Sequence, residues 1–438
     1  MPTSRKMKSQ KTRKTPAEPE PAPQRRTRVT SWRLPILLIA GLLLIGVALY
    51  VRSSPWMHET FLRSQDLPAL EEIVRRHPDD ALAQYYLGKR YIQAHRYADS
   101  RRVLETAVRL DPDSAQAHLD LGVSYFQLRD MERAQTEFAQ ALRRDDHLAQ
   151  AEFMLGRIAW LRQDSTEALR HLKRATQLDE RYDVAWYGMG VCLIQLGRRP
   201  EALAAMQKAA ALNPKRPEYP TAIGELEVDQ HSDIAEARRQ YERALQLDPN
   251  FGPACALMGS LYLHYPSGSD SLDRAQELLE RATHLPIYRP QDLYRDLGEV
   301  YTQKGQYKKA VAALQESIRR DPRDERSYYA LVRAYRKMGD ARSAAATEAR
   351  FEYVSAKKIR KDSLEVHLQY HPNDDAARLS LARVCRDLGL TQAAINAYRE
   401  YRRRRPGAID SDLERLMQAY TGAAPGAYPQ DFGFPSLP

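Results

Sequence analysis

Four ten-residue windows decide the fold: QYYLGKRYIQ (84–93), HLDLGVSYFQ (118–127), EFMLGRIAWL (152–161) and WYGMGVCLIQ (186–195). Each window has a glycine at its fifth position, these glycines stand 34 residues apart, and Gly224 follows at the same interval. An alanine lies 19 residues after each of the first four glycines, at Ala107, Ala141, Ala175 and Ala209. This period predicts antiparallel helix pairs that cross closely where the side chains are small.

Stops and small residues complete the pattern. The Leu-Asp-Pro runs at 110–112 and 247–249 predict the ends of second helices, because proline cannot continue the helical hydrogen-bond ladder. The period of 34 and the order L-G-x-x-Y, Ala, aromatic, Ala, Pro resemble the tetratricopeptide repeat. The resemblance covers residues 60–406. It implies an all-α, right-handed superhelical solenoid of about nine helix-turn-helix hairpins.

Irregular segments flank and interrupt the repeats. Residues 67–78 are expected to form a lone second helix that covers the first repeat. The interval from Pro322 to Pro372 is fifty residues, which predicts a lengthened second helix and an extra helical turn between 352 and 371. A capping helix is expected at 407–420, followed by an unstructured segment at 421–438.

The N-terminal segment differs sharply from the remainder of the chain. The net charge is +10, and residues 1–33 contribute ten Lys or Arg against two Glu, so the body is nearly neutral. This polar, basic segment is expected to be a disordered tail. Residues 34–51 carry no charge and are long enough, at about 27 Å, to predict one transmembrane helix.

The basic tail also predicts a topology. Positive charge before the apolar stretch places the N-terminus in the cytoplasm and the repeats on the far side, periplasmic or extracytoplasmic. A cleavable signal peptide is the rival interpretation, but the basic region is long and no small-x-small site follows the stretch. The sequence therefore favours an uncleaved signal anchor in a single-pass membrane protein.

Motifs for chemistry are missing from the sequence. It contains no G-x-x-x-x-G-K-[ST], G-x-G-x-x-G, H-E-x-x-H or G-x-S-x-G. Cys192, Cys255 and Cys385 are far apart and form no C-x-x-C pair, so we expect three buried thiols and no cysteine-rich metal site. We expect no catalytic residue, no cofactor and no metal, and the near-neutral body argues against nucleic-acid binding.

The resemblance also implies a binding surface. Such repeats bind through a concave groove lined by the first helices, at positions three before and one, four and five after the glycine. The candidate groove residues are Tyr85, Phe126, Phe153, Trp160, Tyr187, Tyr329, Arg333, Arg336 and Arg383. An apolar half and a basic half predict a client peptide with aromatic and acidic residues. Packing of these aromatic rings between neighbouring repeats is the alternative.

Two functions remain open at this point. The first is a membrane-anchored scaffold that binds a client protein in envelope assembly or secretion. The alternative is a non-catalytic regulatory or accessory subunit of a membrane enzyme complex, such as a polysaccharide synthase or a cytochrome-maturation system.

Overall fold

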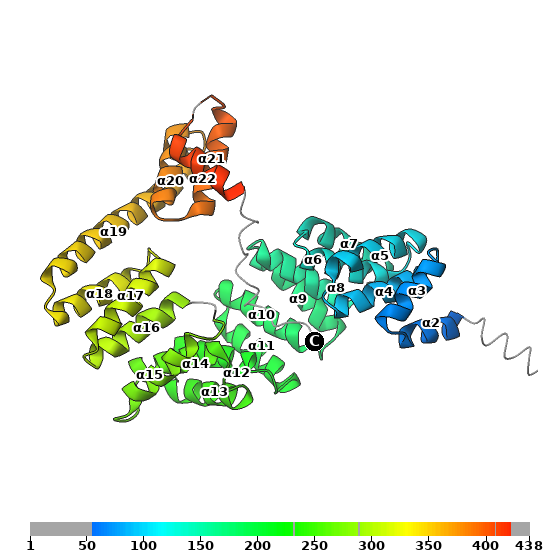
Figure 1. Cartoon of the computed structure of the whole chain (residues 1–438), viewed down its shortest axis with the longest axis horizontal. Helices are drawn as coiled ribbons and strands as arrows, with labels where there is room; N and C mark the ends of the chain where they lie inside the picture. The colour runs from blue at the N-terminus through cyan, green and yellow to red at the C-terminus, as the bar shows by residue number, and fades with distance from the viewer. Residues whose placement is uncertain (1–54, 231–232, 288–289, 408, 422–438) are drawn as a thin grey trace, which may run out of the picture. The chain divides into compact units, whose positions relative to one another are not determined.

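The computed structural model describes residues 55–421 except 231–232, 288–289 and 408. The predicted tail, the predicted span and nearly all of the predicted C-terminal segment lie outside the described residues. The described part holds 21 helices and no strand (Figure 1). The predicted all-α solenoid of helical hairpins is confirmed.

Nine hairpins follow one another, each made of a first and a second helix. The first helices are α4 (Ala81–Gln93), α6 (Ala115–Gln127), α8 (Ala149–Leu161), α10 (Asp183–Gln195), α12 (Glu218–Gln230), α14 (Gly252–His264), α16 (Pro290–Gln303), α18 (Glu325–Met338) and α20 (Asp375–Asp387). The second helices are α5 (Tyr97–Leu110), α7 (Met131–Arg144), α9 (Ser165–Leu178), α11 (Arg199–Leu212), α13 (Ile234–Leu247), α15 (Ser271–Ala282), α17 (Tyr307–Arg320), α19 (Ala341–Tyr370) and α21 (Thr391–Arg404).

The chain divides into an N-terminal unit that ends at Arg76 and a second unit that begins at His77. The first unit contains α2 (Pro55–Ser64) and α3 (Leu67–Arg76), which includes most of the predicted lone helix. In α3 the Asp66 carboxylate accepts a hydrogen bond from the Ala69 amide at 3.0 Å and so satisfies a free donor of the first turn. The second unit holds all nine hairpins and α22 (Ser411–Thr421), which lies at the predicted capping position.

The crossing glycines leave room for large side chains of the second helices. A Cβ atom on Gly122 would lie 2.6 Å from Phe138, and one on Gly156 would lie 2.8 Å from Leu172. Both distances are shorter than any ordinary carbon contact. The same relation holds for the pairs Gly88–Leu104, Gly190–Met206, Gly224–Tyr241, Gly259–Leu279 and Gly298–Leu314. The repeating glycine is therefore a packing requirement of the hairpin.

A histidine–glutamate pair joins the two helices in each of two successive hairpins. His118 of α6 lies 2.7 Å from Glu137 of α7, and both side chains are largely buried. One period later the partners are exchanged, because Glu152 of α8 lies 2.6 Å from His171 of α9. Each pair joins the two helices of one hairpin. The histidine lies on the first helix in one repeat and on the second helix in the next, and the glutamate does the reverse.

Apolar packing connects each hairpin to the next. One cluster of buried residues runs from Leu104 to Leu226 and a second runs from Ala237 to Ala334. Each second helix packs against the first helix of the following hairpin, from α5 against α6 to α19 against α20. A single hairpin has an uncovered apolar side, so this stacking supplies much of the burial.

The long hairpin, α18 with α19, departs from the regular pattern. Its second helix has 30 residues, whereas α11 has 14. The predicted lengthening is present, and the extra helical residues continue α19 as one helix. Val354 of α19 packs in one buried cluster with Tyr328 of α18. The same cluster contains Val384 of α20 and Leu388, which follows α20.

The single-pass membrane localisation expected from the sequence is corrected. Among the residues that the structure describes, no helix is both long and apolar enough to cross a membrane. Most helices have 13 or 14 residues, about 20 Å, against a hydrocarbon core of about 30 Å. The longer α19 carries charged residues such as Lys357, Arg360 and Asp362. The predicted span 34–51 lies outside the described residues, and the topology derived from it is withdrawn.

Candidate functional site

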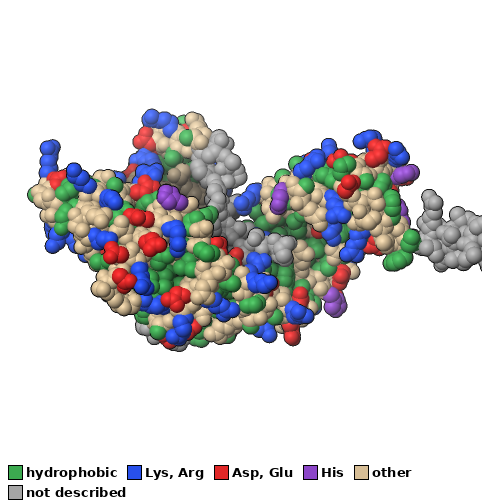
Figure 2. Space-filling model, turned by 60° about the horizontal axis from the view of Figure 1, so that its bottom comes forward, with side chains coloured by type: hydrophobic (Ala, Val, Ile, Leu, Met, Phe, Trp, Pro, Cys, Tyr) green, Lys and Arg blue, Asp and Glu red, His purple; other side chains and the backbone are tan. Residues whose placement is uncertain are grey.

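The candidate site is the first-helix face, which we define as the residues three before and one, four and five after the crossing position of each first helix. Its N-terminal zone, on α4 to α10, is apolar. The half-buried members of this zone are Tyr85, Ile92, Trp160, Leu161, Val191 and Ile194. These side chains pack against the core on one side and remain partly accessible on the other. Figure 2 shows hydrophobic side chains between mixed charges on one side of the molecule.

Three of the predicted groove aromatics are buried inside the stack. Phe126 is 3% exposed, Phe153 is fully buried and Tyr187 is 8% exposed. The Phe153 ring lies 5.3 Å from the ring of Tyr182, and the Tyr187 ring lies 5.2 Å from that of Tyr219. Neighbouring repeats therefore cover these rings, and we exclude them from the accessible part of the face.

A buried cation accompanies two of these rings. The Arg157 guanidinium lies 4.7 Å from the centre of the Phe126 ring and 5.8 Å from that of Phe153, and Arg157 is only 6% exposed. Burial lowers the pKa of Arg157 to about 10, which still leaves it charged at neutral pH. A cation on two aromatic faces stabilises the interface between α6 and α8. Arg157 directly follows Gly156 and so occupies a groove position in the sequence, which did not indicate its burial.

Asp120 is the unusual acid of the apolar zone. Its Oδ2 atom is shielded from solvent and has no hydrogen-bond partner among the described residues. Burial raises the pKa of Asp120 to about 6, although Lys89 and the Tyr85 hydroxyl act in the opposite direction. A carboxyl group that titrates near pH 6 thus lies beside Tyr85, one of the accessible aromatics.

The C-terminal zone of the face is basic and exposed. Tyr329 is 62% exposed, and its ring lies 4.6 Å from that of Phe351 on α19. The predicted arginines are present at the surface but have acidic neighbours. Arg333 contacts Glu299 at 2.7 Å, Arg336 contacts Glu348, and Arg383 contacts Asp410 at 2.7 Å. Their guanidinium groups are accessible and can exchange these partners for others, because exposed ion pairs are weak.

An acidic zone lies on and beside the first-helix face of α12 to α16, between the apolar and basic zones. Arg295 contacts Asp292 at 2.6 Å, Asp296 at 3.2 Å and Asp324 at 3.5 Å. Burial alone would raise the pKa of Asp296. Its contacts with His264, Arg295 and the Ser260 hydroxyl instead hold this pKa below the ordinary value. Our sequence prediction of an apolar and a basic half missed this zone. The residues were visible in the sequence, where Glu225 follows Gly224 and Asp292 and Asp296 precede Gly298, but their positions do not repeat from one hairpin to the next.

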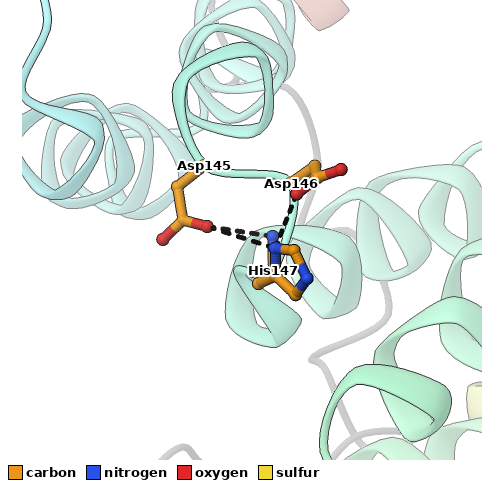
Figure 3. A group of neighbouring side chains, drawn as sticks. All are labelled: Asp145, Asp146 and His147. Atoms are coloured by element: carbon orange, nitrogen blue, oxygen red, sulfur yellow. Dashed lines mark hydrogen bonds and ion pairs between the residues drawn. The ribbon is translucent and has the colours of Figure 1, made fainter.

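Asp145, Asp146 and His147 come close enough together to suggest a cation site (Figure 3). The His147 Nδ1 atom lies 2.6 Å from Asp146, and the His147 amide donates to the Asp145 side chain at 3.0 Å. The same amide-to-side-chain hydrogen bond closes the corresponding turns at Asp111, Asp179, Asn213, Asp248 and Asp321. The group is therefore the ordinary turn between repeats, and its ring and Asp146 point into solvent. We assign it no metal.

The three cysteines are buried, as the sequence predicted. Burial raises the pKa of Cys192 to about 12, and it also raises the pKa values of Cys255 and Cys385. Thiols with such pKa values stay protonated at neutral pH and are poor nucleophiles. Their role is that of small core residues.

Comparison with known proteins identifies the repeats. Sequence profiles of the tetratricopeptide repeat match residues 87–149, 120–183, 159–226 and 298–339. Tetratricopeptide repeat protein 1 of Schizosaccharomyces pombe is 25% identical over 247 residues, which are 53% of this chain and 22% of the relative. The chain thus spans less than a quarter of that relative's length.

Solved structures with similar repeats include PilF of Pseudomonas aeruginosa, with 22% identity over 47% of this chain and 90% of that chain and a TM-score of 0.42. A tetratricopeptide repeat protein of Parabacteroides merdae has 14% identity over 61% of this chain and 99% of that chain, with a TM-score of 0.43. Repeats of this type generally mediate protein–protein interactions and are typically non-catalytic. The profile matches show that this chain carries tetratricopeptide repeats at residues 87–226 and 298–339.

Proposed function

We propose that the first-helix face is a groove that binds an extended or helical segment of a partner protein. The observation that carries this proposal is the change of chemistry along one face. Half-buried apolar side chains on α4 to α10 give way to carboxylates on and beside the face of α12 to α16, and then to exposed arginines on α18 and α20. Such a face offers different contacts at different points, which favours one register and one orientation of a bound segment.

The accessible anchors differ from the buried rings. Tyr85, Trp160 and Ile194 are half-buried, so a partner's apolar side chains can pack on them without disturbing the core. Tyr329 and the arginines 333, 336 and 383 offer a polar and basic end for a partner's aromatic and acidic residues. The envelope role depended on the predicted span and is not part of this proposal.

Site-specific photo-crosslinking tests the proposal directly. A photoreactive amino acid replaces Trp160, Ile194 or Arg336 in the full chain, and adducts formed in lysate are identified. The matched control places the same group at Leu110 or Leu247, which are 40% and 38% exposed at the ends of second helices. We expect the same partner from all groove positions and none from the controls.

The affinity of the purified partner then provides the quantitative test. Trp160→Ala is expected to weaken binding by about 1–3 kcal/mol, because large aromatic side chains dominate interface energies. Leu110→Ala is expected to change it by less than about 0.5 kcal/mol. A partner that crosslinks equally from both sets, or that ignores Trp160→Ala in a folded protein, would show that this face is not the binding site.

A further inference from the structure

A pocket of about 160 Å³ lies on the first-helix face, where α12, α14 and α16 meet. Its walls are apolar and consist of Pro253, Ala256, Leu257, Ile287 and Leu293. Its polar lining consists of Glu225, Ser260, Asp292, Arg295 and Asp296. The volume corresponds to about five water molecules, at about 30 Å³ each, and so to one long side chain rather than a larger ligand.

The polar lining carries excess negative charge. Three carboxylates and one guanidinium face the pocket. The guanidinium of Arg295 is divided among Asp292, Asp296 and Asp324, all within 3.5 Å. The imidazole of His264 lies 3.8 Å from Asp296. Within the part of the chain that the structure describes, the three lining carboxylates outnumber the two cations that contact them, Arg295 and a protonated His264.

Asp296 keeps its charge at neutral pH. Asp296 is only 4% exposed, yet hydrogen bonds and the charge of Arg295 hold its pKa below the ordinary value. The same contact with Asp296 raises the pKa of His264. A buried carboxylate that stays ionised attracts cations strongly, because little water screens it.

We infer that this pocket binds a lysine or arginine side chain of the partner segment. The methylene groups of such a side chain would pack on Ala256, Leu257 and Leu293, and its cationic end would reach Glu225, Asp292 and Asp296. The inference rests on the proposed function and extends it. The partner segment carries a basic residue between its apolar part and its acidic part.

Peptide pools test this inference on the full chain. Each fluorescein-labelled pool has a fixed central residue (Lys, Arg, Gln, Glu or Leu) within randomised peptides of about ten residues, long enough when extended to cross three first helices. Affinity is measured by fluorescence anisotropy. We expect the Lys and Arg pools to bind about tenfold or more tightly than the Gln and Glu pools, as one charge-assisted contact predicts. Added salt is expected to reduce the difference.

Two variants and a control locate the effect. Glu225→Gln combined with Asp292→Asn removes charge from the lining, and Ala256→Leu fills the pocket without changing its charge. Each is expected to abolish the preference for Lys and Arg. The control, Glu242→Gln with Glu277→Gln, removes two exposed carboxylates from the second helices α13 and α15 and is expected to keep the preference. Circular dichroism confirms that each variant is folded.

The outcomes separate this inference from the proposed function. Pools that bind without a preference for Lys or Arg, or a preference that survives both pocket variants, overturn the inference and leave the groove intact. Because the two variants act by different means, a folding defect in one leaves the other as the test. No binding of any pool to the wild-type chain overturns the peptide groove itself.

Discussion

Tyr187 and Tyr329 occupy the same position in their hairpins, three residues before the crossing position, but one side chain is buried and the other is exposed. Tyr187 of α10 is 8% exposed and packs against Tyr219 of the next first helix. Tyr329 of α18 is 62% exposed and contacts Phe351 of its own hairpin. A position within the repeat therefore fixes the direction of a side chain, whereas the neighbouring repeat decides whether it is covered.

The hairpins themselves differ in the same two regions. The regular hairpins, α4 to α11, cross at a glycine and have second helices of 14 residues. The long hairpin carries Val332 at the crossing position and a second helix of 30 residues. The regular hairpins use their first-helix face largely for packing between repeats, and the long hairpin leaves it open to solvent.

The largest expected effect tests this difference in burial. Phe153→Ala should lower the free energy of unfolding by about 3–5 kcal/mol, because it removes a fully buried ring from between two repeats. Tyr329→Ala should lower it by less than about 1 kcal/mol, because most of its ring is already in water. Chemical denaturation followed by circular dichroism measures both.

Equal effects of the two substitutions would show that Tyr329 is covered in solution and would remove the contrast. Hydrogen exchange adds a spatial test. Protection should fall first in the hairpins next to Phe153, since each repeat contacts mainly its neighbours.

The next effect concerns the crossing position. Gly156→Leu should destabilise the chain by about 3 kcal/mol, at the upper end of overpacking effects, because even a Cβ atom would lie 2.8 Å from Leu172. Val332→Leu in the long hairpin should change stability by less than about 1.5 kcal/mol, since that crossing already holds a branched side chain. Melting temperatures of the two variants provide the comparison. A tolerated Gly156→Leu would mean that α9 can move away from α8.

Much of the fold could be predicted from the sequence because the repeat constrains it at many positions. The glycine spacing, the small residues and the proline stops gave the hairpins and most of their boundaries. The lengthened helix was also predicted, from the fifty residues between Pro322 and Pro372. The extra helical turn expected between 352 and 371 is part of α19 itself, since the chain between 352 and 370 contains no proline or glycine to interrupt this helix.

The binding face was harder to predict because its chemistry depends on adjacent repeats. Phe153 and Trp160 both stand at groove positions in the sequence. Only the structure shows that Tyr182 and Arg157 lie against the Phe153 ring and cover it. Asp292 and Asp296 were visible in the sequence, but their shared contact with Arg295 and the pocket beside it depend on three-dimensional packing.

A pH-dependent effect of intermediate size is expected at Asp120. The pKa is about 6 in the folded chain and about 3.8 when unfolded, so between these values the folded state binds a proton that the unfolded state lacks. The contribution of Asp120 to stability should therefore fall as pH rises from about 4 to 6, by about 2 kcal/mol once partial exposure is allowed for. Asp120→Asn should remove this loss and be more stable than wild type at pH 7.5.

Denaturation curves at several pH values measure the Asp120 effect. The control is Glu242→Gln on α13, an exposed acid whose replacement should change stability by less than about 0.5 kcal/mol. An equal pH dependence of wild type and Asp120→Asn between pH 4 and 6 would contradict the assignment.

The smallest effect concerns the turn between the two helices of a hairpin. Arg129 has φ of 65° at this turn, whereas the equivalent residues Gly197 and Gly339 have 74° and 83°. A left-handed conformation costs a non-glycine residue about 1–2 kcal/mol, of which glycine's greater chain entropy offsets about 0.5–1 kcal/mol. Arg129→Gly should therefore stabilise the chain by about 0.5–1 kcal/mol, and Gly197→Ala should destabilise it by a similar amount. Nothing lies within 4 Å of a Cβ built on Gly197, so backbone strain alone sets the sign of the Gly197→Ala effect. Paired urea titrations resolve such differences, and a loss of stability in Arg129→Gly would show that the arginine side chain contributes more than its strained backbone removes.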